Sequence, residues 1–271
     1  MPEMPMKSAV LREGEQMRLQ DVALFFRRSG RFAFGRNKQL RKSRNFWALR
    51  GINLSLYQGE SLGLVGRNGS GKSTLSRVCA GVLVPDRGRV QSNGSVHLLA
   101  LGVGFRPELT GRENVLVSGI LLGLSRREVL EQMDAIEAFA QLGDFMDEPL
   151  GTYSSGMRSR LGFAVSTAIR PDTLILDEVL STGDESFRLR AEARMEELRA
   201  ESGAVMVVSH NVGQVKRLCS RALWLEQGTV LMDGKADQVL DAYSDFCTGP
   251  EGWLKSHPEL LERINSSGDL G

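Results

Sequence analysis

The sequence predicts an α/β domain in which a layered sheet carries a mostly helical insertion. Two short apolar runs, Thr173–Leu176 and Ala204–Val208, have the continuous hydrophobicity of strands that are buried on both faces of a parallel sheet. A third run, Ser61–Val65, is followed by a glycine-rich loop and then by a helical segment from Lys72 to about Ala80. Strands that alternate with helices in this way are typical of α/β layered folds.

The other elements follow from local patterns. Ile52–Tyr57 alternates between apolar and polar residues, as a half-buried strand does. Residues 108–170 are mostly helical in pattern, and Ser125 with Glu128 three residues later forms a capping box at the start of one helix. Leu223–Leu231 has the pattern of a hairpin. We therefore expect an N-terminal extension (1–21), a basic segment (22–45), a main domain (46–236, with its helical part at about 108–170) and a short C-terminal helix with a tail (237–271).

Composition excludes several classes of protein. The 271 residues carry a net charge of +1, which gives the whole chain no attraction to nucleic acid. The three cysteines, Cys79, Cys219 and Cys247, are far apart and form no CxxC pair, so neither a disulfide framework nor a zinc site is expected. The N-terminus has no signal peptide pattern, and no apolar stretch reaches the roughly 20 residues that span a bilayer.

One region has an uneven charge. Between Val22 and Gly59 there is no Asp or Glu, while the basic residues are Arg27, Arg28, Arg31, Arg36, Lys38, Arg41, Lys42, Arg44 and Arg50. A solvated basic loop and contact with an anionic membrane surface both explain this pattern, since each basic residue near such a surface contributes roughly 1 kcal/mol. Nucleic acid is the least favoured partner because the rest of the chain is balanced in charge, and none is expected.

The glycine-rich loop carries the clearest chemistry. Its residues, Gly66-Arg67-Asn68-Gly69-Ser70-Gly71-Lys72-Ser73, match the phosphate-loop pattern G-x-x-x-x-G-K-[ST] between a strand and a helix. The glycines let backbone N–H groups turn inward as an anion-binding nest, and the helix adds its positive end. Lys72 supplies a cation for the outer phosphates, and the hydroxyl of Ser73 is a ligand for Mg²⁺.

A pair of carboxylates follows the strand at Thr173–Leu176. Asp177 is placed to hold Mg²⁺ through its water molecules, and Glu178 is placed to polarise an attacking water molecule. A kinase uses the hydroxyl of its acceptor and does not need that second carboxylate. His210 follows the strand at Ala204–Val208, on the sheet edge where ligands bind in such folds, which favours a role with the γ-phosphate. We therefore expect the site to hydrolyse ATP with Mg²⁺.

The order of these motifs resembles the nucleotide-binding domain of ATP-binding-cassette (ABC) proteins. The phosphate loop, Tyr153-Ser154-Ser155-Gly156-Met157, Asp177-Glu178 and His210 occur in the family's order over roughly Phe46–Gly234. The resemblance implies a P-loop NTPase with a mixed sheet core, a helical insertion and an antiparallel β segment. It also implies the site: Glu178 orients the attacking water, His210 holds it against the γ-phosphate, and Lys72 stabilises the developing charge.

The same resemblance implies a homodimer. In the family the signature segment contacts the nucleotide of the other chain, so each ATP would lie between Lys72 of one chain and Ser154 and Gly156 of its partner. Ser181-Thr182-Gly183-Asp184 is similar to the loop that links the two sites, with Asp184 as its acidic residue. Thr74, next to the phosphate loop, is a further expected nucleotide contact.

A finer resemblance is to the branch that exports polysaccharides such as O-antigen, capsule or teichoic acid. It is carried by Leu101–Asn114 and by Phe46-Trp47-Ala48-Leu49-Arg50. It implies a separate transmembrane permease subunit, contacted near Leu101–Glu108, and a peripheral location on the cytoplasmic face of the inner (cell) membrane. The chain departs from the family where a glutamine usually senses Mg²⁺. Arg106 or Glu108 stands near that place, which leaves the Mg²⁺ shell open.

Two points stay open at this stage. Phe46 and Trp47 are candidates to stack on adenine, and either is as readily explained as core. The alternatives to a polysaccharide exporter are an exporter of lipids or drugs and a soluble ABC ATPase that acts outside transport. The second of these usually has two cassettes in one chain or a long coiled-coil insertion, and neither is evident here.

Overall fold

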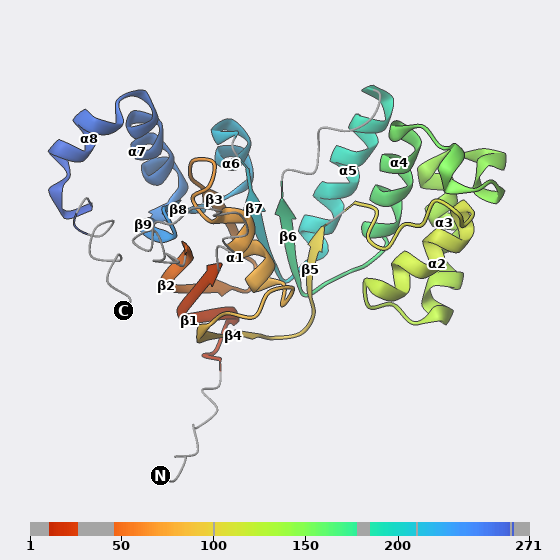
Figure 1. The fold of residues 1–271 in the computed structure, drawn as a ribbon, viewed down its shortest axis with the longest axis horizontal. Helices are drawn as coiled ribbons and strands as arrows, with labels where there is room; N and C mark the ends of the chain where they lie inside the picture. The colour runs from red at the N-terminus through yellow and green to blue at the C-terminus, as the bar shows by residue number, and fades with distance from the viewer. Residues whose placement is uncertain are drawn as a thin grey trace, which may run out of the picture.

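The computed structural model describes residues 11–26, 46–99, 101–177, 185–209, 211–260 and Glu262, and its strands form two sheets. The larger sheet has six strands in the order β5-β6-β7-β3-β8-β9, and the smaller has three in the order β2-β1-β4 (Figure 1). Neighbours in the larger sheet are parallel except β8 and β9, and all neighbours in the smaller sheet are antiparallel. The strands are β1 (Glu15–Phe26), β2 (Phe46–Tyr57), β3 (Ser61–Val65), β4 (Arg87–Ser92), β5 (Val96–Leu99), β6 (Thr173–Asp177), β7 (Ala204–Val208), β8 (Arg221–Glu226) and β9 (Thr229–Lys235).

The centre of the larger sheet confirms the predicted α/β fold with a mixed sheet. All residues of β7 are buried, as are the first four of β6 and the last four of β3. Such strands are covered on both faces, which explains why their sequences are continuously apolar rather than alternating. The hairpin expected at Leu223–Leu231 is formed by β8 and β9.

Helices and the smaller sheet cover the two faces of the larger sheet. On one face, α5 (Glu185–Glu201), α6 (Val212–Leu218) and α7 (Ala236–Thr248) pack over side chains such as Leu174, Val205 and Trp224. On the other face, α1 (Lys72–Cys79) and the smaller sheet pack over alternate residues of the same strands. Two core layers therefore hold the larger sheet in a fixed position between them.

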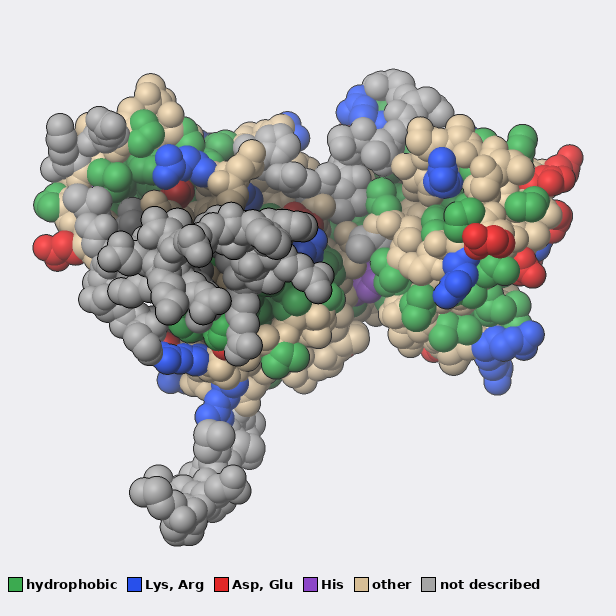
Figure 2. All heavy atoms as spheres, viewed as in Figure 1, with side chains coloured by type: hydrophobic (Ala, Val, Ile, Leu, Met, Phe, Trp, Pro, Cys, Tyr) green, Lys and Arg blue, Asp and Glu red, His purple; other side chains and the backbone are tan. Residues whose placement is uncertain are grey.

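Three helices from the middle of the chain form a separate lobe beside β5 and β6 (Figure 1). It consists of α2 (Gly111–Leu121), α3 (Arg126–Ala140) and α4 (Ser155–Ser166), with short 3₁₀ turns η2 (Gly143–Asp147) and η3 (Leu150–Thr152). Its helices share a hydrophobic core of their own, and Figure 2 shows basic and acidic side chains interspersed on its surface. The predicted capping box of Ser125 and Glu128 starts α3. Within the part of the chain that the structure describes, every helix is too short or too polar to cross a membrane.

The N-terminal part of the chain differs from the prediction. Residues 1–21 were expected to be an extension, with the main domain starting at Phe46, but β1 pairs with both β2 and β4. Met17, Leu19 and Val22 are fully or almost fully buried, so the predicted start is too late. Register shifts interrupt β1, including one between Leu19 and Val22, and they break the two-residue alternation that identifies a strand. Residues 27–45 of the basic segment lie outside the described residues.

The C-terminal part also differs. The prediction of one short helix and a tail after about Asp237 is replaced by two helices, α7 and α8 (Pro250–Ser256). Pro250 stands at the first position of α8, where its missing N–H costs no hydrogen bond.

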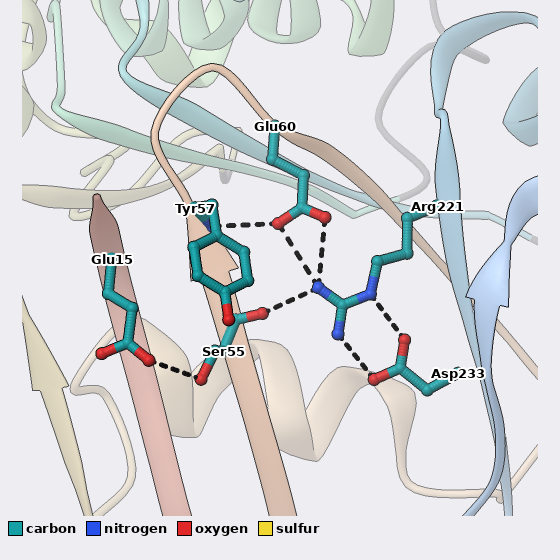
Figure 3. A network of polar contacts seen from close by, with 6 residues as sticks. All are labelled: Glu15, Ser55, Tyr57, Glu60, Arg221 and Asp233. Atoms are coloured by element: carbon teal, nitrogen blue, oxygen red, sulfur yellow. Dashed lines mark hydrogen bonds and ion pairs between the residues drawn. The ribbon is translucent and has the colours of Figure 1, made fainter. Parts of the chain in front are cut away.

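A network of polar contacts around Arg221 joins the two sheets (Figure 3). Arg221, at the start of β8, donates to both carboxylate oxygens of Asp233 on β9, at 2.6 Å each. It also donates to Glu60, just before β3, at 3.1 Å and to the carbonyl of Ser55 on β2 at 2.9 Å. The hydroxyl of Ser55 donates in turn to Glu15 on β1. The hydrogen bonds with Asp233, and then with Glu60, raise the pKa of Arg221 above its ordinary value.

We expect Arg221→Ala to lower the free energy of unfolding by about 2–3 kcal/mol, because two half-buried carboxylates lose their partner. Chemical denaturation measures this loss. The matched control is Arg127→Ala, since the pair of Arg127 and Glu131 is exposed on α3 and should contribute about 0.5 kcal/mol or less. Equal losses in the two variants would contradict the role assigned to Arg221.

Candidate functional site

The phosphate loop lies where predicted, between the end of β3 and the start of α1. Main-chain atoms of other strands press against it. A Cβ atom on Gly66 would collide with the carbonyl oxygen of Leu225 on β8, and one on Gly71 would lie 2.6 Å from the carbonyl oxygen of Ala48 on β2. Both glycines have positive φ (152° and 110°). The loop can therefore take this path only with glycine at these two positions.

Polar groups converge inside the loop. The ammonium group of Lys72 is largely buried and donates to the carbonyls of Gly66 at 2.7 Å and Arg67 at 3.1 Å. The hydroxyl of Ser70 is buried and has no hydrogen-bond partner among the described residues. Ser73 is exposed in the first turn of α1, a turn without acidic residues. A cation, an unpartnered donor and a helix N-terminus at one place fit a phosphate group.

Asp177 ends β6 at the same edge of the sheet. It pairs with Val208 on β7, which pairs with Leu64 on β3, one residue before Val65. With neighbouring strands about 4.8 Å apart, Asp177 lies about 10 Å across the sheet from the strand that leads into the loop. An acidic oxygen at that distance and the hydroxyl of Ser73 fit a Mg²⁺ ion bound to the phosphates.

The two residues on either side of position 210 are fixed by hydrogen bonds. The hydroxyl of Ser209 donates to Gln214 at 3.0 Å and accepts from the amide of Asn211 at 3.0 Å. Asn211 caps α6. His210 itself, Glu178 and the segment Ser181–Asp184 lie outside the described residues, so their roles stay predictions.

The signature segment is at the start of α4. Ser154 is the N-cap, and its hydroxyl accepts from the amide of Met157 at 3.2 Å. Tyr153 is buried and donates to the carbonyl of Phe145, which fixes the approach to the helix. Ser154 is exposed, and the first turn of α4 has no acidic residue. This helix end can therefore receive an anion from outside the chain.

The two aromatic candidates for adenine differ in their surroundings. Trp47 packs edge-on against Phe25, with ring centroids 5.2 Å apart, and Arg87 lies 5.8 Å from the centre of its ring. Phe46, at the start of β2, is 50% exposed. Only Phe46 of the two offers a largely accessible ring.

The comparisons with known proteins agree with this geometry. A family model described as "ABC transporter" matches residues 49–181, which include the phosphate loop, the start of α4 and Asp177. The O-antigen export system ATP-binding protein RfbB of Myxococcus xanthus is 46% identical over 209 residues, 77% of this chain and 48% of that protein. The protein of the same name from Klebsiella pneumoniae is 43% identical over 206 residues, 76% of this chain and 84% of that protein. The chain belongs to the ABC transporter family.

The chain spans about half the length of the first of these relatives. This chain has the fold of a solved structure, a dimeric ATP-binding cassette in a post-hydrolysis state bound to ADP and phosphate. The two superpose with a TM-score of 0.60. They are 22% identical, and the match covers 81% of this chain and 98% of that one. The predicted resemblance to ABC nucleotide-binding domains is thus confirmed.

Asn114 organises the loop where ABC proteins usually carry a glutamine, and sequence reasoning gave it no role. It is fully buried on α2. Its side-chain oxygen accepts from the amide of Arg106 at 2.7 Å, and its nitrogen donates to three carbonyls, those of Arg106, Leu109 and Thr110, at 2.9–3.0 Å. Arg106 and Glu108 point their side chains to solvent from this fixed loop. The signal for Asn114 was its place just after the capping pair of Thr110 and Glu113.

Glu226 is a second residue that sequence reasoning missed. It ends β8, is buried, and accepts two hydrogen bonds from Arg67 of the phosphate loop, at 3.0 and 2.7 Å. These bonds raise the pKa of Arg67. Glu226 stands just before the hairpin turn at Gln227 and Gly228, at the end of an apolar strand. A carboxylate buried there needs a partner of opposite charge elsewhere in the chain.

We expect Gly66→Ala to abolish binding of a nucleotide, because its methyl group would displace the loop from Leu225. Gly69→Ala is the matched control: Gly69 also has positive φ (80°), but a Cβ atom there would meet nothing within 4 Å. Its strain of about 1–2 kcal/mol should lower stability while binding persists. Titration with a fluorescent nucleotide compares the two, and equal binding by both variants would contradict the steric argument.

Proposed function

We propose that the chain is an ATP-binding and ATP-hydrolysing subunit of an ABC transporter that powers export of a polysaccharide or lipid-linked glycan. The observation that carries the proposal is the register of the larger sheet. It brings the phosphate loop, Asp177 and the turn after β7 to one edge, which is the arrangement that a nucleotide triphosphate and an attacking water require.

In this proposal each residue of the site has a defined role. Lys72 and the loop amides bind the phosphates and stabilise the charge that develops as the γ-phosphate leaves. Ser73 and Asp177 would hold Mg²⁺, which neutralises phosphate charge when bound. Glu178 orients the attacking water, and His210 holds it against the γ-phosphate.

The proposed ATP site is shared by two chains. The start of α4 is exposed in its own lobe, whereas Lys72 is buried in the phosphate loop, so Ser154 and Gly156 are available to a nucleotide held by another chain. The dimeric cassette with the same fold supports this arrangement. Thr74 adds a contact beside the loop, and Asp184 links the two sites.

Phe46 is the proposed partner of adenine. Its ring is accessible, whereas the ring of Trp47 is engaged by Phe25 and Arg87. An unchanged affinity of Phe46→Ala for ATP would reject this assignment.

The export assignment rests on the relatives, two of which are named O-antigen export system ATP-binding proteins. The chain would then work on the cytoplasmic face of the inner membrane and pass its closing motion to a transmembrane permease, through the loop that Asn114 organises. The basic segment would help it to contact an anionic membrane surface. Export of a lipid or drug remains the alternative, as does a soluble ABC ATPase.

We expect Glu178→Gln to bind ATP and to accumulate as a dimer, because the closed state forms while hydrolysis stops. Lys72→Ala should lose ATPase activity without accumulating the dimer, since the phosphates lose their cation. Phosphate release and size-exclusion chromatography with ATP measure the two effects. Glu131→Gln, exposed on α3, is the control that should behave as the wild type. Normal hydrolysis by Glu178→Gln would show that another group activates the water.

Deletion of the gene should remove a surface glycan, and only an active copy should restore it. Co-purification from membranes should recover a transmembrane partner with the wild-type chain. An unchanged glycan would contradict the cargo, and would favour a lipid or drug exporter. Recovery of the chain without any membrane partner would favour the soluble ATPase.

A further inference from the structure

The side chain of Arg67 leaves the phosphate loop and contacts two elements outside it. Its guanidinium group donates twice to one carboxylate oxygen of Glu226, at 3.0 and 2.7 Å. The same group lies over the ring of Phe246 on α7, with 4.8 Å between Cζ and the ring centre. A planar cation between a carboxylate and an aromatic face is held in both position and orientation.

Glu226 can hold Arg67 in this way because it is buried. The residue is 3% exposed, and its other carboxylate oxygen has no hydrogen-bond partner among the described residues. A buried carboxylate without a compensating charge is strongly unfavourable, so Glu226 depends on Arg67. The end of β8 and the phosphate loop are therefore bound to each other.

Phe246 belongs to an aromatic group that fixes α7 and α8 to the larger sheet. Its ring centre lies 4.9 Å from that of Trp224 on β8 and 5.8 Å from that of Trp253 on α8. Trp224 and Phe246 are fully buried. The ring beneath Arg67 thus moves only if the C-terminal helices move.

The main chain of Arg67 connects this support to the phosphate-binding groups. Its carbonyl accepts from the ammonium group of Lys72 at 3.1 Å and from the amide of Ser70 at 3.1 Å. The carbonyl of Ser70 accepts in turn from the amide of Gly228 in the β8–β9 turn at 2.8 Å. A shift of the Arg67 side chain that also moves the main chain of Arg67 therefore displaces the carbonyl oxygen to which Lys72 donates.

We infer that Arg67 is a positioning residue that couples α7 to the phosphate loop, so that the packing of the C-terminal helices sets the affinity for ATP, and ATP in turn tightens α7. The inference rests on the proposed binding of ATP. Coupling of this kind is reciprocal, because each site changes the equilibrium of the other by the same factor.

The variant that tests the coupling is Phe246→Leu, which keeps an apolar side chain but removes the aromatic face. We expect ATP binding about 3–5-fold weaker, as for loss of a cation–π contact. Val129→Ala is the control, because Val129 is fully buried on α3, in the core of the helical lobe, and its truncation costs stability without loosening α7. It should leave ATP binding unchanged. Chemical denaturation of both variants checks that their losses of free energy of unfolding are comparable.

A second background separates coupling from simple damage. Arg67→Lys retains a charge for Glu226 but loses the planar group, so Phe246→Leu should have no further effect on ATP binding in that background. The same Phe246→Leu effect in both backgrounds would overturn the inference, as would equal effects of Phe246→Leu and Val129→Ala on ATP binding. Failure of the wild-type chain to bind ATP would instead overturn the proposed function, and the coupling with it.

Hydrogen exchange tests the reverse direction in the wild-type chain. ATP should slow the exchange of backbone amides in residues 240–248, and the slowing should be smaller in Arg67→Lys at saturating ATP. Exchange that ATP leaves unchanged in this part of α7, while the phosphate loop becomes protected, would overturn the inference.

Discussion

The phosphate loop depends on main-chain oxygens of two strands that belong to different sheets. The carbonyl oxygen of Leu225 on β8 lies close to Gly66, and that of Ala48 on β2 lies close to both Gly71 and Gly228, so that none of these glycines has room for a side chain. These contacts involve main-chain atoms, which cannot move aside as a side chain can. The position of the loop therefore depends on the position of the two sheets relative to each other. The network around Arg221 and the core between the sheets fix that relation.

Much of the fold could be predicted because the decisive signals are local. Ser61–Val65 and Ala204–Val208 coincide with β3 and β7, since a strand buried on both faces is apolar along almost its whole length. The capping box of Ser125 and Glu128 marks the start of α3 because it satisfies backbone donors within four residues. The phosphate loop was found for the same reason, as its glycines, lysine and serine act on one ligand from one short segment.

The features that escaped prediction depend on partners far away in the chain. β4 (Arg87–Ser92) has a polar sequence and is a strand because β1 pairs with it. The role of Glu226 depends on Arg67, which is 159 residues away. The role of Asn114 depends on the loop at Arg106, which folds back onto it. For Glu178, Asp184 and His210 the sequence and the family remain the support, and the firm turn of Ser209 and Asn211 is what the described residues add.

The lobe of α2, α3 and α4 has a hydrophobic core largely its own, joined to one core of the larger sheet through Phe163 on α4 and Phe139 on α3. A core that is largely its own allows the lobe to open locally with a free energy of its own. A substitution within the lobe can therefore loosen the signature segment while the phosphate loop keeps its shape. In the proposed dimer, such a chain would still bind nucleotide with its own phosphate loop but would contact the nucleotide of the other copy poorly, so that damage in one copy would lower hydrolysis in the other.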